Sequence, residues 1–171
     1  MATGRVLYLL GCAAPPVLEF PGVVERAQAA GWDVCVGLTP SAADWLSETV
    51  GVAGLAELTG HPVRVRHRRP SQVDPWPKAS VALVAPLTFN SLNAWALGLT
   101  GVWVPAFAAE APGKGVPVVA VPCVNPALQA HPQFGRSVAV LEEMGVRVLP
   151  SAQPSGFPWD VALAECVGSG L

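Results

Sequence analysis

The feature that most constrains the fold of this 171-residue chain is a set of short, almost entirely apolar segments spread along it. They occupy residues 5–11, 32–38, 79–85 and 116–121. Each has the length of a β-strand. Continuous apolar runs of this length, in place of alternating ones, are typical of strands buried on both faces of a parallel sheet.

Segments with apolar residues at helical spacing follow these runs, and a last short strand is expected at 146–149. The expected helices cover residues 17–30, 42–46, 88–99 and 133–144. Alternating strands and helices predict an α/β fold with a three-layer, doubly wound parallel sheet of the Rossmann-like or flavodoxin-like kind. We expect a single domain over residues 1–171, with a core at about 4–150 and a C-terminal extension at 151–171.

Three segments interrupt this pattern. Residues 63–66 alternate like a strand, and the proline-rich segment 67–78 is expected to be an unusually long loop. Residues 101–115, which are rich in Gly, Pro and Ala, are expected to form a flexible excursion.

Composition excludes several classes of protein. Apolar residues make up 51% of the chain and charged residues 13%, which excludes disorder driven by high charge. The formal net charge is -2, so we expect no nucleic-acid partner. No apolar run reaches the roughly 18 residues of a membrane span, so we expect no membrane partner and a cytoplasmic location. The scattered cysteines form no CxxC pair, and no metal site is expected. Few charges on so apolar a chain predict burial between subunits of a homo-oligomer.

The ends of the expected strands share one chemistry. The segments there are 11–14, 39–41, 85–91 and 122–125. They hold small, hydroxyl or amide side chains next to a helix start and no charged residue. Ligands of open α/β sheets bind beyond the carboxyl ends of the strands, and helix N-termini favour phosphate. This pattern favours a neutral polar ligand with one phosphate over a metal or a triphosphate.

In this order, the segments resemble the homo-oligomeric flavin-containing cysteine decarboxylase superfamily. Ala85-Pro86-Leu87-Thr88-Phe89-Asn90-Ser91 is similar to the Pro-Ala-Ser-Ala-Asn-Thr motif that holds FMN in that group. Pro122-Cys123-Val124-Asn125, followed by His131-Pro132, is similar to its Pro-Ala-Met-Asn substrate clamp. Residues 141–146 are similar to its Leu-Glu-Glu-Leu-Gly-Val segment. The resemblance spans residues 6–149.

This resemblance implies FMN as the cofactor, and it implies which residues hold it. They are Gly11, Cys12, Ala13, Thr39, Ser41, Pro86, Thr88, Phe89, Asn90 and Ser91. It also implies that Asn125 holds a substrate carboxylate and that the assembly is a trimer or a multiple of trimers. We expect Trp95 and Trp103 to anchor the contact between subunits, and the alternative is that they cover the flavin ring.

Two departures concern catalysis. The position of the superfamily's catalytic histidine holds Gln72, and the histidine of that loop is His67. The later loop, which carries a cysteine in the pantothenate enzymes, reads Ser-Ala-Gln-Pro-Ser-Gly over 151–156. We therefore take His67 as a candidate displaced base and Cys123 as a candidate reactive thiol. The alternatives are a solvated basic loop for His67 and a small packing residue for Cys123.

The resemblance implies a flavoprotein that oxidises, or oxidatively decarboxylates, a small or peptidyl substrate bearing a thiol or a carboxylate. Two alternatives remain. One is a non-catalytic flavin-binding module, which the missing histidine and cysteine favour. The other is an enzyme similar to the flavin prenyltransferases, which is disfavoured because the turn at 11–14 lacks that group's Gly-Ala-Ser pattern.

Overall fold

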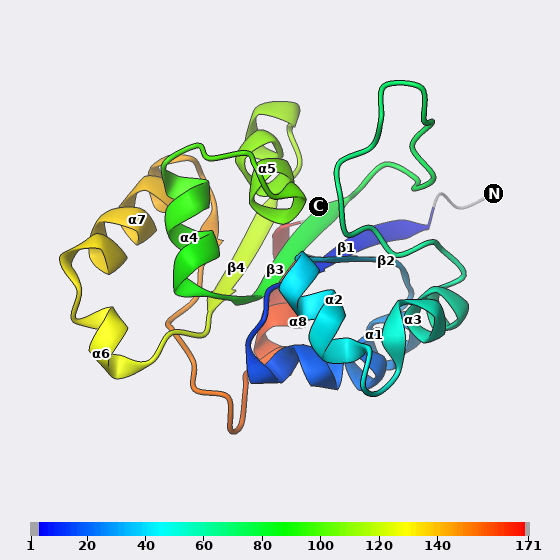
Figure 1. Ribbon diagram of the computed structural model, residues 1–171, viewed down its shortest axis with the longest axis horizontal. Helices are drawn as coiled ribbons and strands as arrows, with labels where there is room; N and C mark the ends of the chain where they lie inside the picture. Colours follow the sequence, from blue (N-terminus) through cyan, green and yellow to red (C-terminus); the bar gives the residue numbers. More distant parts are fainter. Residues whose placement is uncertain (1–3, 170–171) are drawn as a thin grey trace.

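The computed structural model describes residues 4–169, which form a five-stranded, all-parallel sheet (Figure 1). Its strand order is β2-β1-β3-β4-β5. The strands are β1 (Arg5–Gly11), β2 (Trp32–Leu38), β3 (Val81–Leu87), β4 (Val118–Pro122) and β5 (Arg147–Val148). The predicted α/β fold is confirmed.

Eight α-helices of the described chain cover the two faces of this sheet. They are α1 (Phe20–Ala29), α2 (Pro40–Leu46), α3 (Gly51–Thr59), α4 (Phe89–Ala96), α5 (Trp103–Glu110), α6 (Pro126–Gln129), α7 (Pro132–Glu143) and α8 (Trp159–Ser169). Two short 3-10 helices, η1 (Pro15–Glu19) and η2 (Pro112–Lys114), adjoin α1 and α5.

Alternate residues of the strands enter two separate cores. Leu7 and Leu9 pack with side chains of α1, α2, α3 and α8, whereas Tyr8 and Leu10 pack with those of α4, α5 and α7. Because both faces are covered, β1, β2, β3 and β4 are almost entirely apolar, as the sequence suggested.

The segment 101–115 was expected to be a flexible excursion, and this is wrong. It contains α5 and η2, and Trp103 and Val104 are buried on the sheet. Pro105 lies in the first turn of α5, where a missing backbone N–H is tolerated. Helix α3 was also not predicted. Residues 63–66 form only one parallel bridge, between Arg64 and Gly37 of β2.

The C-terminal segment contributes to the core. Phe157, Trp159, Ala162 and Cys166 are buried in the same cluster as Leu7, because α8 packs on β3 and β4. The core therefore continues beyond residue 150, where we expected an extension to begin. None of the helices within residues 4–169 combines the length and apolar character needed to cross a bilayer.

The two tryptophans expected at a subunit contact lie inside the chain instead. Trp95 is 1% exposed and Trp103 is 5% exposed. Trp95 extends from α4 into the core, and Trp103 contacts the rings of Trp76 and Phe107. The apolar residues of 88–99 indicated that this helix is buried on more than one side. They did not indicate whether the chain itself or another subunit covers it. The exposed apolar side chains here are those of Leu97 and Leu99.

Gly11 provides a test of packing at the end of β1. A Cβ atom there would lie 2.5 Å from Cζ of Phe20 and 2.9 Å from Cγ2 of Val17. We expect Gly11→Ala to lower the free energy of unfolding by about 1–3 kcal/mol, as overpacking does. Urea denaturation measures this. Gly22→Ala is the matched control, because its Cβ would meet nothing within 4 Å in α1 and should stabilise by ~0.5–1 kcal/mol. A Gly11→Ala midpoint equal to that of the wild type would contradict the packing account.

Candidate functional site

The carboxyl ends of four strands are joined by backbone hydrogen bonds at one edge of the sheet. The N–H of Thr39 donates to the carbonyl of Gly11 at 3.0 Å. The N–H of Cys12 donates to Pro86 at 3.0 Å, and that of Cys123 donates to Leu87 at 2.9 Å. The four turns that the sequence singled out therefore adjoin one another.

Polar residues of these turns cap the helices that follow. The side-chain oxygen of Thr39 accepts from the N–H of Ala42 at 3.2 Å, and that of Thr88 accepts from Ser91 at 3.4 Å. Oδ1 of Asn125 accepts from Leu128 at 2.9 Å. Capping fixes where α2, α4 and α6 begin, so the helix starts face the same edge.

A cavity of about 470 Å³ lies among these turns, which is within the usual range for a small-molecule site. Six of the predicted site residues line it. They are Ala13, Thr88, Phe89, Asn90, Cys123 and Asn125. The remaining lining residues are Ala14, Pro15, Val124, Leu128, Gln153 and Pro154. None of the twelve is charged.

The other predicted cofactor residues do not line this cavity. They are Gly11, Cys12, Thr39, Ser41, Pro86 and Ser91. Gly11 packs on Phe20, and Cys12, Thr39 and Ser91 are buried. Burial is the main cause that raises the pKa of the Cys12 thiol, although hydrogen bonds from Ser91 and Thr88 oppose it. In the described chain these residues shape the turns behind the lining, and cofactor contact by any of them stays a prediction.

Cys123 and Asn125 lie together on the turn after β4. Cys123 is partly exposed, and burial raises the pKa of its thiol, so the thiol is protonated at neutral pH. Asn125 uses Oδ1 for its helix cap, which leaves its Nδ2 hydrogens as donors. The turn thus offers a neutral thiol and an amide donor.

His67, the other candidate catalytic residue, is not in this cavity. It lines a second cavity with Arg64 and Arg68, and the two cavities share no lining residue. Its Nε2 lies 3.0 Å from the carbonyl of Thr100, so that nitrogen carries a hydrogen and donates. Within one chain, the structure does not bring His67 and Cys123 together. Gln72 also lies outside both cavities, and its Oε1 accepts from the N–H of Arg69.

The segment after β5, which the sequence analysis considered only for its missing cysteine, also lines the cavity through Gln153 and Pro154. The N–H of Ala152 donates to the carbonyl of Pro122 at 2.9 Å, and the N–H of Val124 donates to Oγ of Ser151 at 3.2 Å. These bonds hold Gln153 and Pro154 against the turn at 122–125. The signal was available, because this segment follows the end of a fifth parallel strand.

An open parallel sheet with a cavity beyond the carboxyl ends of its strands defines a cofactor-binding α/β protein. The chain belongs to the Flavoprotein family, whose model matches residues 5–167. No curated protein sequence matches it.

Solved structures share the fold over nearly the whole chain. The crystal structure of the FMN-dependent cysteine decarboxylase TvaF from thioviridamide biosynthesis is 22% identical, with a TM-score of 0.80 and coverage of 97% of this chain and 98% of that one. MrsD from Bacillus sp. HIL-Y85/54728 is 15% identical, with a TM-score of 0.74 and coverage of 98% and 96%. AnUbiX (PadA1), solved with FMN and dimethylallyl pyrophosphate, is 13% identical, with a TM-score of 0.75 and coverage of 98% and 92%.

The partial burial of Cys123 predicts the order and the rate at which its thiol is alkylated. Cys12, Cys35 and Cys166 are buried, so iodoacetamide should label Cys123 first. Because the thiolate is the reactive form and burial raises the pKa, labelling should be slow at neutral pH. It should then accelerate about tenfold per pH unit below that pKa. Mass spectrometry over a pH series measures this. Cys123→Ala should abolish the first labelling event, and fast labelling at pH 7 would refute the assignment.

Proposed function

We propose that this chain binds FMN in the cavity lined by Asn90, Cys123 and Asn125 and oxidises a small or peptidyl substrate that bears a thiol or a carboxylate. The observation that carries the proposal is the convergence of three uncharged strand-end turns, at 11–14, 85–91 and 122–125, on one cavity. FMN dependence of TvaF, whose fold this chain shares, supports it further.

The residues present suit FMN. The Asn90 amide is exposed at the start of α4 and makes no hydrogen bond to another described residue, so its donors and acceptor are free for ring or ribityl oxygens. The first-turn N–H groups of α4 face the same edge and favour a phosphate. Thr39 directly follows β2, at the place where an acidic residue would hold the adenosine ribose of a dinucleotide, which favours FMN over FAD or NAD.

A substrate carboxylate would be held by the Nδ2 hydrogens of Asn125, beside the neutral thiol of Cys123. Bound FMN would supply the two-electron oxidation. The group that takes a substrate thiol proton would have to come from outside the lining of one chain, because no imidazole or carboxylate lines the cavity in residues 4–169. His67 remains the candidate, with Nδ1 as the accepting atom.

A second candidate function is flavin binding without catalysis. It is favoured by Gln72 at the position of the superfamily histidine and by the absence of any charged lining residue among the described part of the chain. His131 does not replace the missing catalytic histidine. Its Nδ1 accepts from the N–H of Gln133 at 3.0 Å and so caps α7.

FMN binding is tested by titration. The wild-type protein should quench FMN fluorescence, and Asn90→Asp should weaken binding about tenfold or more, because it puts a negative charge beside a cofactor that carries phosphate. Gln72→Glu makes the same amide-to-carboxylate change outside the cavity and should leave binding unchanged. A wild-type protein that neither carries FMN nor quenches it would overturn the proposal.

The missing base predicts slow chemistry toward the substrates of related enzymes. General base catalysis contributes about 10²–10⁴-fold. FMN-loaded protein, incubated anaerobically with phosphopantothenoylcysteine or a peptide ending in cysteine, should therefore show little flavin bleaching and little CO₂ release. Rapid bleaching with stoichiometric CO₂ would contradict this. Loss of such activity in His67→Ala would then identify the base.

Exposed apolar residues support one surface as the subunit contact of the proposed homo-oligomer. Leu97, Leu99 and Val102, between α4 and α5, are 64%, 57% and 40% exposed. We expect Leu97→Glu with Leu99→Glu to lower the mass measured by sedimentation to that of a monomer, because charge would oppose burial of this surface. Val161→Glu, at an equally exposed position on α8, is the control. An unchanged mass in the double variant would remove this surface from the contact.

A further inference from the structure

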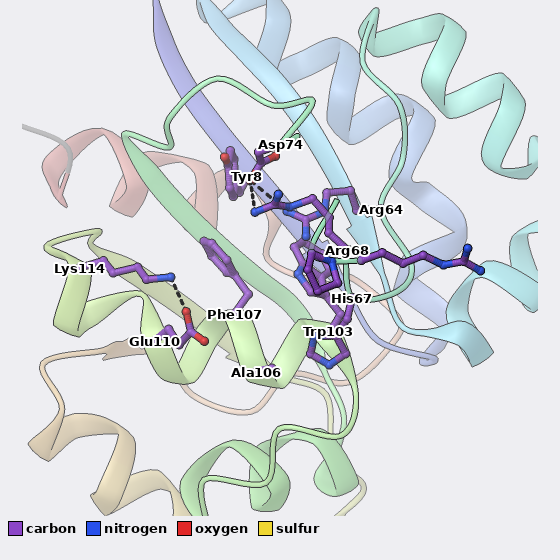
Figure 2. Close-up of a pocket in the computed structure, with 12 residues that line it drawn as sticks. Tyr8, Arg64, His67, Arg68, Asp74, Trp103, Ala106, Phe107, Glu110 and Lys114 are labelled. Atoms are coloured by element: carbon purple, nitrogen blue, oxygen red, sulfur yellow. Dashed lines mark hydrogen bonds and ion pairs between the residues drawn. The ribbon is translucent and has the colours of Figure 1, made fainter. Parts of the chain in front are cut away.

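The cavity that holds His67 lies over β1, between the loop 64–74 and α5 (Figure 2). Its volume is about 430 Å³. Tyr8, Trp103 and Phe107 supply aromatic surface, with ring centroids 5.3 Å apart for Tyr8 and Phe107 and 5.8 Å apart for Trp103 and Phe107. Burial is the main cause that raises the pKa of Tyr8 to about 12, so its hydroxyl stays neutral and donates to Pro77 at 2.7 Å.

Arg64 is the fixed cation of this cavity. Its backbone N–H donates to Val36 and its carbonyl accepts from Leu38, so β2 holds the residue in place. The carbon at the centre of its guanidinium lies 4.1 Å from the ring centroid of Trp103 and 5.3 Å from that of Trp76. Stacking on aromatic rings orients a guanidinium without neutralising it.

The hydrogen bonds of Arg64 are incomplete. Its side chain is 11% exposed, and its Nη1 lies 3.5 Å from Oδ2 of Asp74. Its Nε is buried without a partner among the described residues. A buried charged donor without an acceptor is costly, and such groups in native proteins usually have a partner. The Asp74 contact of this guanidinium is long and its Nε has no partner in the described chain, so the cavity has a positioned cation whose hydrogen bonds are incomplete.

The charges around this cavity do not balance. Arg64, Arg68, Arg69 and Lys114 line it, against Asp74 and Glu110. Both Arg64 and Arg68 reach the single carboxylate of Asp74, at 3.5 and 3.6 Å, while Lys114 pairs with Glu110. Figure 2 shows Phe107 between that pair and the arginines. Setting His67 aside, two positive charges are left uncompensated.

We propose that this cavity is a second ligand site, separate from the flavin cavity, that binds a phosphate monoester carrying an aromatic or other apolar group. A phosphate monoester with two negative charges matches the two excess cations, and guanidinium groups donate to phosphate oxygens in pairs. The apolar group would contact Phe107 and Trp103. Within one chain the site shares no lining residue with the flavin cavity, and phosphate binding by its arginines requires no flavin, although His67, the candidate base, also lines it.

Phenyl phosphate is the probe, titrated by calorimetry into the full-length protein with and without saturating FMN. We expect one molecule bound per chain in both cases. Arg64→Met and Arg68→Met should each weaken binding tenfold or more, whereas Arg136→Met, at an exposed position on α7, should not. Phe107→Ala should weaken phenyl phosphate but not inorganic phosphate. Benzoate, with one charge, should bind at least tenfold more weakly than phenyl phosphate.

Several outcomes would overturn the site. Competition by FMN would place the probe in the flavin cavity, and equal affinity in the Arg68→Met and Arg136→Met variants would remove the arginine cluster from the site. Equal affinity for benzoate would refute the doubly charged ligand. Arg68 is half-exposed, so Arg68→Met decides the question if Arg64→Met does not fold. Failure of FMN binding would leave the titration without FMN valid, so the two proposals fail separately.

Discussion

The parallel pairing of β1 with both β2 and β3 is the constraint on which the rest of the structure depends. Tyr8 pairs in register with Cys35 on one side and Ala82 on the other, so three strands end at nearly the same level. Their carbonyl and N–H groups then continue to bond across the turns, from Thr39 to Gly11 and from Cys12 to Pro86. The uncharged cavity exists because these turns cannot separate without breaking the sheet.

The parts of the fold that the sequence predicted are those that local chemistry decides. Strands buried on both faces are almost entirely apolar, so β1, β2 and β3 were visible as nearly continuous apolar runs. The helix expected at 42–46 is α2, and its start depends on local chemistry, because the hydroxyl of Thr39 caps it and Pro40 lies in its first turn. The cavity residues Asn90 and Asn125 lie in strand-end turns that the sequence indicated, and the resemblance to the flavin-containing superfamily assigned their roles.

The parts that the sequence did not predict depend on tertiary packing. Helix α5 contains proline and little polar patterning, and it is stable because Trp103 packs against β2, where Gly37 has no side chain to obstruct it. Trp95 had the composition of an interface residue, and only the fold shows that α4 buries it within the chain. The position of His67 likewise depends on the loop 61–79, which crosses the sheet face with a single backbone bridge to β2.

The same loop explains why the two cavities differ in chemistry. The sheet edge is lined by turns whose side chains serve as helix caps, so short neutral residues are favoured there. The face over β1 is covered by an irregular loop in place of a helix, and such a loop can present long side chains that a packed helix would bury or exclude. Arg64 is held there because Trp76 and Trp103 accept its guanidinium through their ring faces, and Asp74 is shared with Arg68. A solvated arginine cluster would need no aromatic support, and the stacked, partly unpartnered Arg64 is therefore the observation on which the proposed second ligand site rests.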